Sequence, residues 1–108
     1  MKLILNICSL LFATIIFSGC DKGYEVRCSN YYIEPLDSVI IGSQKITFTA
    51  IETGATTGFS KIKQGNHSFV IISKSKKKFS SVLSIPKSGT GKRTIQIDGI
   101  AAINILEE

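Results

Sequence analysis

Two side chains of this sequence, Cys28 and His67, are of types that can form a catalytic or metal-binding pair. A cysteine thiolate beside a histidine base is a common nucleophilic arrangement, and both groups ligate zinc. His67 is the single histidine of the 108 residues, so a zinc site lacks its further soft ligands. We expect Cys28 to be a half-buried strand residue that behaves as a small hydrophobe, and His67 to be a surface residue. A reactive or intermolecularly bonded Cys28 is the alternative.

The carboxylates of Glu34 and Asp37 flank Pro35 and form a second candidate pair. Two carboxylates at a suitable separation can act as general acid and base. Their position in a proline-containing corner between strands instead favours a role in the turn. Tyr31 and Tyr32 precede this corner, and neighbours in a strand face opposite ways. We therefore expect one tyrosine in the core and the other on the surface.

The segment Ser88–Thr94 contains Gly-Thr-Gly-Lys and partly matches a phosphate-binding loop. The genuine pattern requires a glycine five residues before the Gly-Lys pair and Ser or Thr directly after the lysine. Pro86 and Arg93 occupy those two positions. We predict a hairpin tip with solvated charges and no bound nucleotide.

The densest charge lies in residues 74–78. Its members Lys74, Lys76, Lys77 and Lys78 are candidate contacts to an anionic surface, such as phospholipid headgroups, an anionic glycan or an acidic partner. The alternative is a solvated turn that prevents strands from pairing edge to edge. Lys61, Lys63, Lys92 and Arg93 would extend the patch if they lie at the same end. Aromatic residues are not interleaved with these cations, so we expect no nucleic acid partner.

The N-terminal segment has the three-part plan of a secretory signal: Lys2, a largely apolar run from Leu3 to Phe17, then small residues. A membrane-spanning helix needs roughly 20 apolar residues. This run is shorter, and it is interrupted by Asn6, Ser9 and Thr14. The pattern favours a cleaved signal peptide.

The residues Phe17-Ser18-Gly19-Cys20 resemble the lipobox of bacterial lipoproteins, with Phe in place of the usual Leu. This resemblance implies cleavage between Gly19 and Cys20 and a covalent diacylglycerol and N-acyl lipid on Cys20. Two or more acyl chains hold a protein firmly on a membrane. Asp21 resembles an inner-membrane retention signal in enterobacteria-like sorting, and the choice between inner and outer membrane stays open. No other cofactor and no metal are expected.

The overall composition fits one small domain. The net charge of +5 is a moderate basic excess and identifies no particular partner. Of the three cysteines, Cys8 lies in the signal segment and Cys20 is the proposed lipid site, which leaves Cys28 alone. Small exported domains often depend on disulfides. This one is expected to fold on packing alone.

From Tyr24 onward the hydrophobic pattern has a period of two. Residues 44–50 place Ile46, Phe48 and Ala50 on one face, and residues 67–72 are apolar on both faces, as in a central strand. Other strands are expected in residues 39–41, 59–63, 79–85, 94–97 and 100–106. Two-residue hairpin turns are predicted at Gly42-Ser43, Gly65-Asn66 and Asp98-Gly99, with a bulge as the alternative at Gly99.

These observations predict an all-β fold, a small antiparallel β-sandwich or barrel of about seven or eight short strands. Residues 1–19 form the helical signal peptide, residues 20–23 a lipidated tether, and residues 24–108 a single β domain. In style the chain is similar to small β-sandwich lipoproteins, of unassigned activity, in the cell envelope of the Bacteroides and Flavobacterium group.

This resemblance assigns no activity. We expect a membrane-anchored, non-enzymatic module of the cell envelope that binds or scaffolds a protein or glycan through loops at one end of the sandwich. The alternative is a small periplasmic inhibitor or accessory factor for an envelope enzyme or export system. For this alternative, the chain resembles the lysozyme-inhibitor lipoproteins in size.

Overall fold

The computed structural model describes residues 23–42 and 45–108. The predicted signal peptide, the cleavage site after Gly19 and the lipid site Cys20 lie outside the described residues. The β domain predicted from residue 24 lies inside them, apart from residues 43–44.

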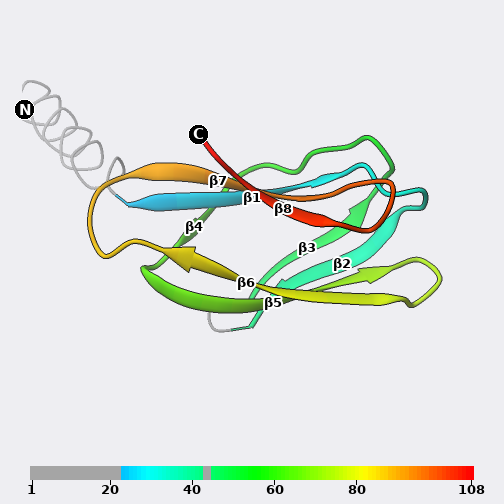
Figure 1. Ribbon diagram of the computed structural model, residues 1–108, viewed down its shortest axis with the longest axis horizontal. Helices are drawn as coiled ribbons and strands as arrows, with labels where there is room; N and C mark the ends of the chain where they lie inside the picture. Colours follow the sequence, from blue (N-terminus) through cyan, green and yellow to red (C-terminus); the bar gives the residue numbers. More distant parts are fainter. Residues whose placement is uncertain (1–22, 43–44) are drawn as a thin grey trace, which may run out of the picture.

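Eight strands form two four-stranded sheets that pack face to face (Figure 1). In chain order they are β1 (Tyr24–Asn30), β2 (Leu36–Ile41), β3 (Ile46–Ile51), β4 (Ser60–Ile62), β5 (Gly65–Ser73), β6 (Lys78–Ile85), β7 (Gly91–Ile97) and β8 (Ile103–Glu107). One sheet has the order β4-β1-β7-β8 and the other β3-β2-β5-β6. The predicted all-β sandwich is confirmed, and β5 lies inside its sheet as its two apolar faces predicted.

One strand pair departs from the antiparallel pattern, because β1 and β7 run parallel. Parallel neighbours need a long crossover between them. Here the chain between β1 and β7 forms β2 to β6, which belong to both sheets. The chain from β6 to β7 passes from one sheet to the other (Figure 1). The hairpin tip predicted at Ser88–Thr94 is therefore wrong: residues 86–90 are a link between sheets, and β7 begins at Gly91.

The core lies between the sheets and contains the inward side chains of both. Fully buried members include Val26, Leu36, Val39, Ile41, Ile71, Leu83, Ile95 and Ile97. Burying each such side chain contributes roughly 1.5–3 kcal/mol. Ile46 and Phe48 face this core as predicted, but Ala50 does not. Its φ of 53° turns Ala50 outward and places Ile51 inside.

The predicted hairpin turns have different outcomes. A hairpin joins the antiparallel pair β2 and β3, as expected, but Ile41 lies opposite Ile46 in register, so the link is longer than the predicted two residues. Gly65-Asn66 is not a hairpin turn, because both residues lie within β5 opposite Ile85 and Ser84 of β6. Gly65 has a φ of 117°, a conformation that favours glycine, where the chain leaves β4 in one sheet for β5 in the other.

The hairpin after Asp98 joins β7 and β8, but its link is longer than two residues. The Asp98 carboxylate accepts hydrogen bonds from the backbone amides of Ile100 and Ala102 at 3.1 and 2.9 Å. This side-chain contact stabilises a five-residue turn in place of a two-residue one.

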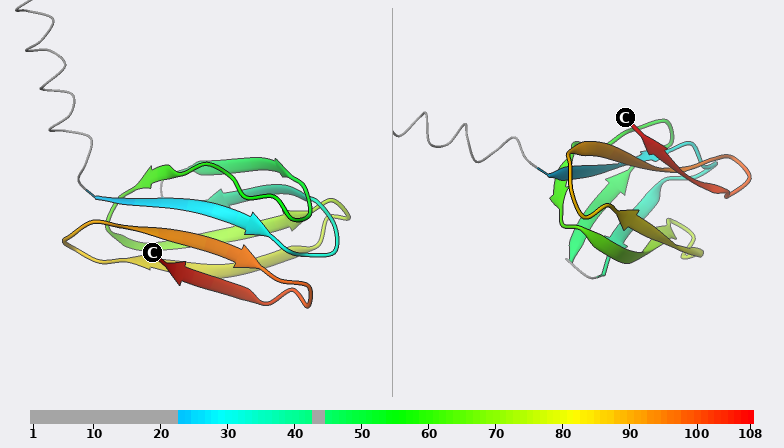
Figure 2. Two further views of the ribbon diagram at one scale, coloured as in Figure 1. Left: turned by 90° about the horizontal axis from the view of Figure 1, so that it is seen from above. Right: turned by 60° about the vertical axis from the view of Figure 1, so that its left-hand side comes forward.

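The sandwich has two ends: we call the end beside Gly23 the tether end, after the tether predicted for residues 20–23, and the opposite end the distal end. At the tether end, Tyr24 lies opposite Ile62 on one side and Gly91 on the other. At the distal end, β1 finishes at Asn30 beside Ile97. The C-terminus points back toward the tether end (Figure 2).

Candidate functional site

The distal end is built around the loop of residues 31–35 between β1 and β2. The amide of Tyr31 donates to the carbonyl of Ile97 at 2.8 Å, which places the β7–β8 turn on one side of the loop. The amide of Lys74 donates to the carbonyl of Pro35 at 2.9 Å, which places the β5–β6 turn on the other side. Three turns far apart in sequence are thus joined by backbone hydrogen bonds.

Large apolar side chains are exposed on two of these turns. The exposed fraction is 52% for Tyr31, 75% for Ile33 and 86% for Ile100. Tyr32 is 5% exposed and contacts the Phe79 ring edge-on, which confirms that one tyrosine of the pair is in the core. Sequence patterns did not reveal Ile33 or Ile100 as surface residues.

The lysine-rich turn lies beside this loop, and all four of its lysines are exposed. Lys76 forms an ion pair with Asp37. The Glu34 carboxylate accepts a hydrogen bond from the amide of Ser75 at 2.7 Å, which lowers the pKa of Glu34 below its ordinary value. Glu34 and Asp37 therefore have a structural role, but the turn that they hold is the neighbouring β5–β6 turn and not, as predicted, their own proline-containing corner.

The other basic residues do not extend this patch, because they lie at the tether end. Lys61 and Lys92 lie opposite Glu25 in register, and Arg93 lies opposite Val26. Lys92 lies over the ring of Phe59 at 4.8 Å, and Arg93 lies over the ring of Tyr24 at 5.1 Å. Aromatic faces attract these cations, so two of the charges are held against the domain.

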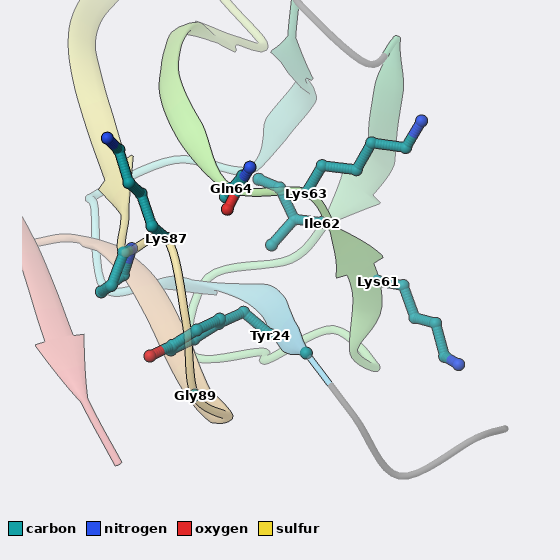
Figure 3. A pocket seen from close by; sticks show the side chains of 9 residues that line it. Tyr24, Lys61, Ile62, Lys63, Gln64, Lys87 and Gly89 are labelled. Carbon is teal, nitrogen blue, oxygen red and sulfur yellow. The ribbon is translucent and has the colours of Figure 1, made fainter. Parts of the chain in front are cut away.

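A pocket of about 550 Å³ opens at the tether end. It is lined by Gly23, Tyr24, Lys61, Ile62, Lys63, Gln64, Pro86, Lys87 and Gly89. Figure 3 shows the Tyr24 ring and Ile62 in its interior, with the lysine side chains extending outward in different directions. The Tyr24 hydroxyl donates to the carbonyl of Ser88 at 3.1 Å and fixes the ring against the β6–β7 link.

The core contains the two residues of the candidate nucleophilic pair on different sheets. Cys28 is 1% exposed on β1, and burial raises its pKa to about 12. A nucleophilic cysteine needs a lowered pKa. The expected surface position of His67 is wrong: it is 4% exposed because β5 begins two residues earlier, and its Nε2 lies 2.7 Å from the carbonyl of Lys63.

We predict that Cys28 is unreactive in the folded protein. Its reaction with a maleimide should be at least about a hundredfold slower than in denaturant, because the thiol reacts only when the sandwich opens. Mass spectrometry of the mature protein checks this, since a lipidated Cys20 carries no thiol. Equal rates in buffer and denaturant would contradict the buried position.

Within residues 23–42 and 45–108, no cluster of three His, Cys, Asp or Glu side chains is placed to hold a metal ion. The same residues contain no helix of the length and hydrophobicity needed to cross a membrane.

Comparisons with known proteins bear on the fold. No protein-family model matches the chain, and no curated protein matches it. Among solved structures the chain is similar to the NMR structure of a protein from Eubacterium rectale, with a TM-score of 0.53 and 13% sequence identity. The match covers 82% of this chain and 90% of the other. The likeness is therefore one of fold, and the described domain shares its β architecture with that protein.

Proposed function

We propose that this chain is a lipid-anchored, non-enzymatic binding module of the cell envelope. Its distal end binds a partner protein that presents an acidic surface. The observation that carries this proposal is the distal end itself, where exposed Tyr31 and Ile33 lie on the loop between the turn of exposed Ile100 and the lysine-rich turn.

The apolar side chains support a protein partner. Ile33 and Ile100 are more than half exposed, and exposed apolar residues that gather on a small domain often mark an interaction surface. Aromatic side chains such as Tyr31 are enriched in the centres of protein interfaces. The hydrogen bonds from neighbouring turns hold the loop in one conformation, which lowers the entropy cost of binding.

The charges support an acidic partner. Lys74, Lys77 and Lys78 add positive charge beside the apolar surface, and Lys76 shares its charge with Asp37. Complementary charge increases the association rate and sets the orientation of the complex more than it adds affinity. Lipid attachment through Cys20 places this end away from the membrane, since β1 begins at the tether end and finishes at the distal loop (Figure 2).

Site-specific photo-crosslinking in the full chain, expressed in its own cells, tests the proposal. A photoreactive residue at Ile33 or Ile100 should give a discrete adduct, and the same residue at exposed Thr47 near the tether end should not. Replacing Lys74, Lys76 and Lys77 by Glu should lower the adduct yield by about tenfold, because the charge is reversed.

Two results would contradict this function. One is an equal adduct yield from Thr47. The other is a distal adduct whose yield does not change on charge reversal.

A further inference from the structure

The tether-end pocket combines an apolar interior with a cationic rim. Tyr24, Ile62 and Pro86 contribute apolar surface, and Lys61, Lys63 and Lys87 contribute the charges. In Figure 3 the three lysine side chains diverge around the opening. None of the described residues that line the pocket is acidic. Long lysine side chains can cover apolar surface with their stems while their ammonium groups reach polar surroundings.

The covalent structure places this pocket close to the proposed lipid. Gly23 lines the pocket, and Cys20 precedes it by three residues. Three residues span at most about 11 Å when extended. The polar headgroup layer on each side of a bilayer is roughly 5–8 Å thick. A lipid on Cys20 therefore brings the pocket opening to the depth of the headgroups or just above them.

Three acidic residues of the described chain lie at this end: Glu25 on β1, and Glu107 and Glu108 at the end of β8. Glu25 has Lys61 and Lys92 opposite it in register. The Glu108 carboxylate accepts hydrogen bonds from the Thr94 hydroxyl and Arg27, the first of which contributes most to the lowering of its pKa. Glu107 lies beside Arg93 on β8. The described cations at this end, Arg27, Lys61, Lys63, Lys87, Lys92 and Arg93, outnumber these three carboxylates two to one, so this end of the domain carries a net positive charge.

We propose that the tether-end pocket and its rim rest on the membrane surface and bind the headgroups of anionic phospholipids. The ammonium groups of Lys61, Lys63 and Lys87 contact lipid phosphates, and the Tyr24 ring lies at the level where aromatic residues gather at membrane interfaces. This inference rests on the proposed lipid attachment at Cys20. It gives the domain a fixed orientation in which the distal end points away from the bilayer.

Lysine acylation of the mature, lipid-bearing protein in vesicles tests this orientation, because the chain contains its own controls. On vesicles rich in phosphatidylglycerol, Lys61, Lys63 and Lys87 should react about fivefold more slowly than on phosphatidylcholine vesicles. Lys74, Lys76 and Lys77 should react at unchanged rates. High salt should remove the protection, and inorganic phosphate added to the protein in neutral micelles should not reproduce it.

A tryptophan reporter gives an independent measurement, because the sequence contains no tryptophan. With a nitroxide-headgroup quencher in anionic vesicles, a Gln64→Trp protein should be quenched at least about twofold more than an Ile33→Trp protein. Changing Lys61, Lys63 and Lys87 to Gln should reduce this difference to the part that the anchor alone supplies. Changing Lys74, Lys76 and Lys77 to Gln, the matched control, should leave it intact.

The outcomes separate this inference from the lipid anchor on which it rests. Intact mass shows whether Cys20 carries lipid. A lipid-bearing protein with equal lysine reactivity on both vesicle types overturns the headgroup contact and leaves the anchor standing. Protection that is equal on neutral and anionic vesicles and that high salt does not remove also overturns the headgroup contact, because the position of the pocket near the membrane would alone explain such protection. A mature protein without lipid on Cys20 overturns both proposals.

Discussion

Replacing Asn30 by Ala is expected to lower the free energy of unfolding by about 3–5 kcal/mol. A domain of this size has a total stability of roughly 5–10 kcal/mol, so a large part of it would be lost. The effect should exceed that of any substitution on the surface of the domain.

The physical reason is the number of backbone groups that one side chain satisfies. Asn30 is fully buried at the end of β1. Its amide nitrogen donates to the carbonyls of Glu34 and Ile51 at 3.1 and 3.0 Å, and its amide oxygen accepts from the amide of Tyr32 at 2.9 Å. Alanine would leave all three groups without this partner. The contacts to Ile51 and Tyr32 are buried, and each buried unsatisfied group costs about 1–3 kcal/mol.

Urea unfolding followed by circular dichroism measures the effect. Asn104→Ala is the matched control, because Asn104 is exposed on the edge strand β8, and its change should stay within about 0.5 kcal/mol. The m-value of Asn30→Ala should equal that of the unchanged protein. A loss below about 1 kcal/mol would show that Asn30 does not hold the distal end together.

Seven of the eight strands overlap ranges that the sequence predicted, because their alternation reports the burial of each face, whereas β1 received no range of its own. The sequence did not predict how the strands divide between the two sheets. Gly65-Asn66 has the composition of a hairpin turn, yet β4 pairs with β1 and β5 pairs with β2 and β6. A short strand beside a glycine can turn back on its neighbour or cross to the other sheet, and local composition does not distinguish the two. His67 was misplaced for the same reason, since its burial depends on where β5 begins.

The two surfaces proposed here depend on contacts that are distant in sequence. Tyr31 and Ile100 come together because β1 and β7 are parallel neighbours, a pairing that no local signal indicates. The sequence identified the lysines of residues 74–78 by their density alone. It could not show that Lys61 and Lys63 lie at the opposite end, since that follows from the pairing of β4 with β1. A surface formed by several turns can therefore be identified only from the structure and not from local sequence patterns.

Lysines lie at both ends of the domain. Charge alone therefore does not decide which end faces a membrane. Here the rim lysines of the tether-end pocket lie beside Gly23, and the lysine-rich turn lies at the distal end. Both proposals thus depend on a lipid at Cys20, because only an anchor there turns one end toward the bilayer.

Replacing Cys20 by Ala is expected to abolish maturation. The thiol is the acceptor of diacylglycerol, and alanine offers no atom on which the thioether can form. Because the signal peptidase of lipoproteins acts on the acylated precursor, residues 1–19 should stay attached. Immunoblotting should show a larger precursor in place of the mature form, and labelling with a radioactive fatty acid should fall to background.

The chain offers a matched cysteine control for this experiment. Cys28→Ala removes a buried thiol from β1 and leaves the lipobox resemblance intact. It should mature and incorporate fatty acid normally, with some loss of stability from the missing side chain. Normal maturation and labelling of the Cys20→Ala chain would refute the lipoprotein hypothesis, and it would also remove the reason for placing the tether-end pocket on a membrane.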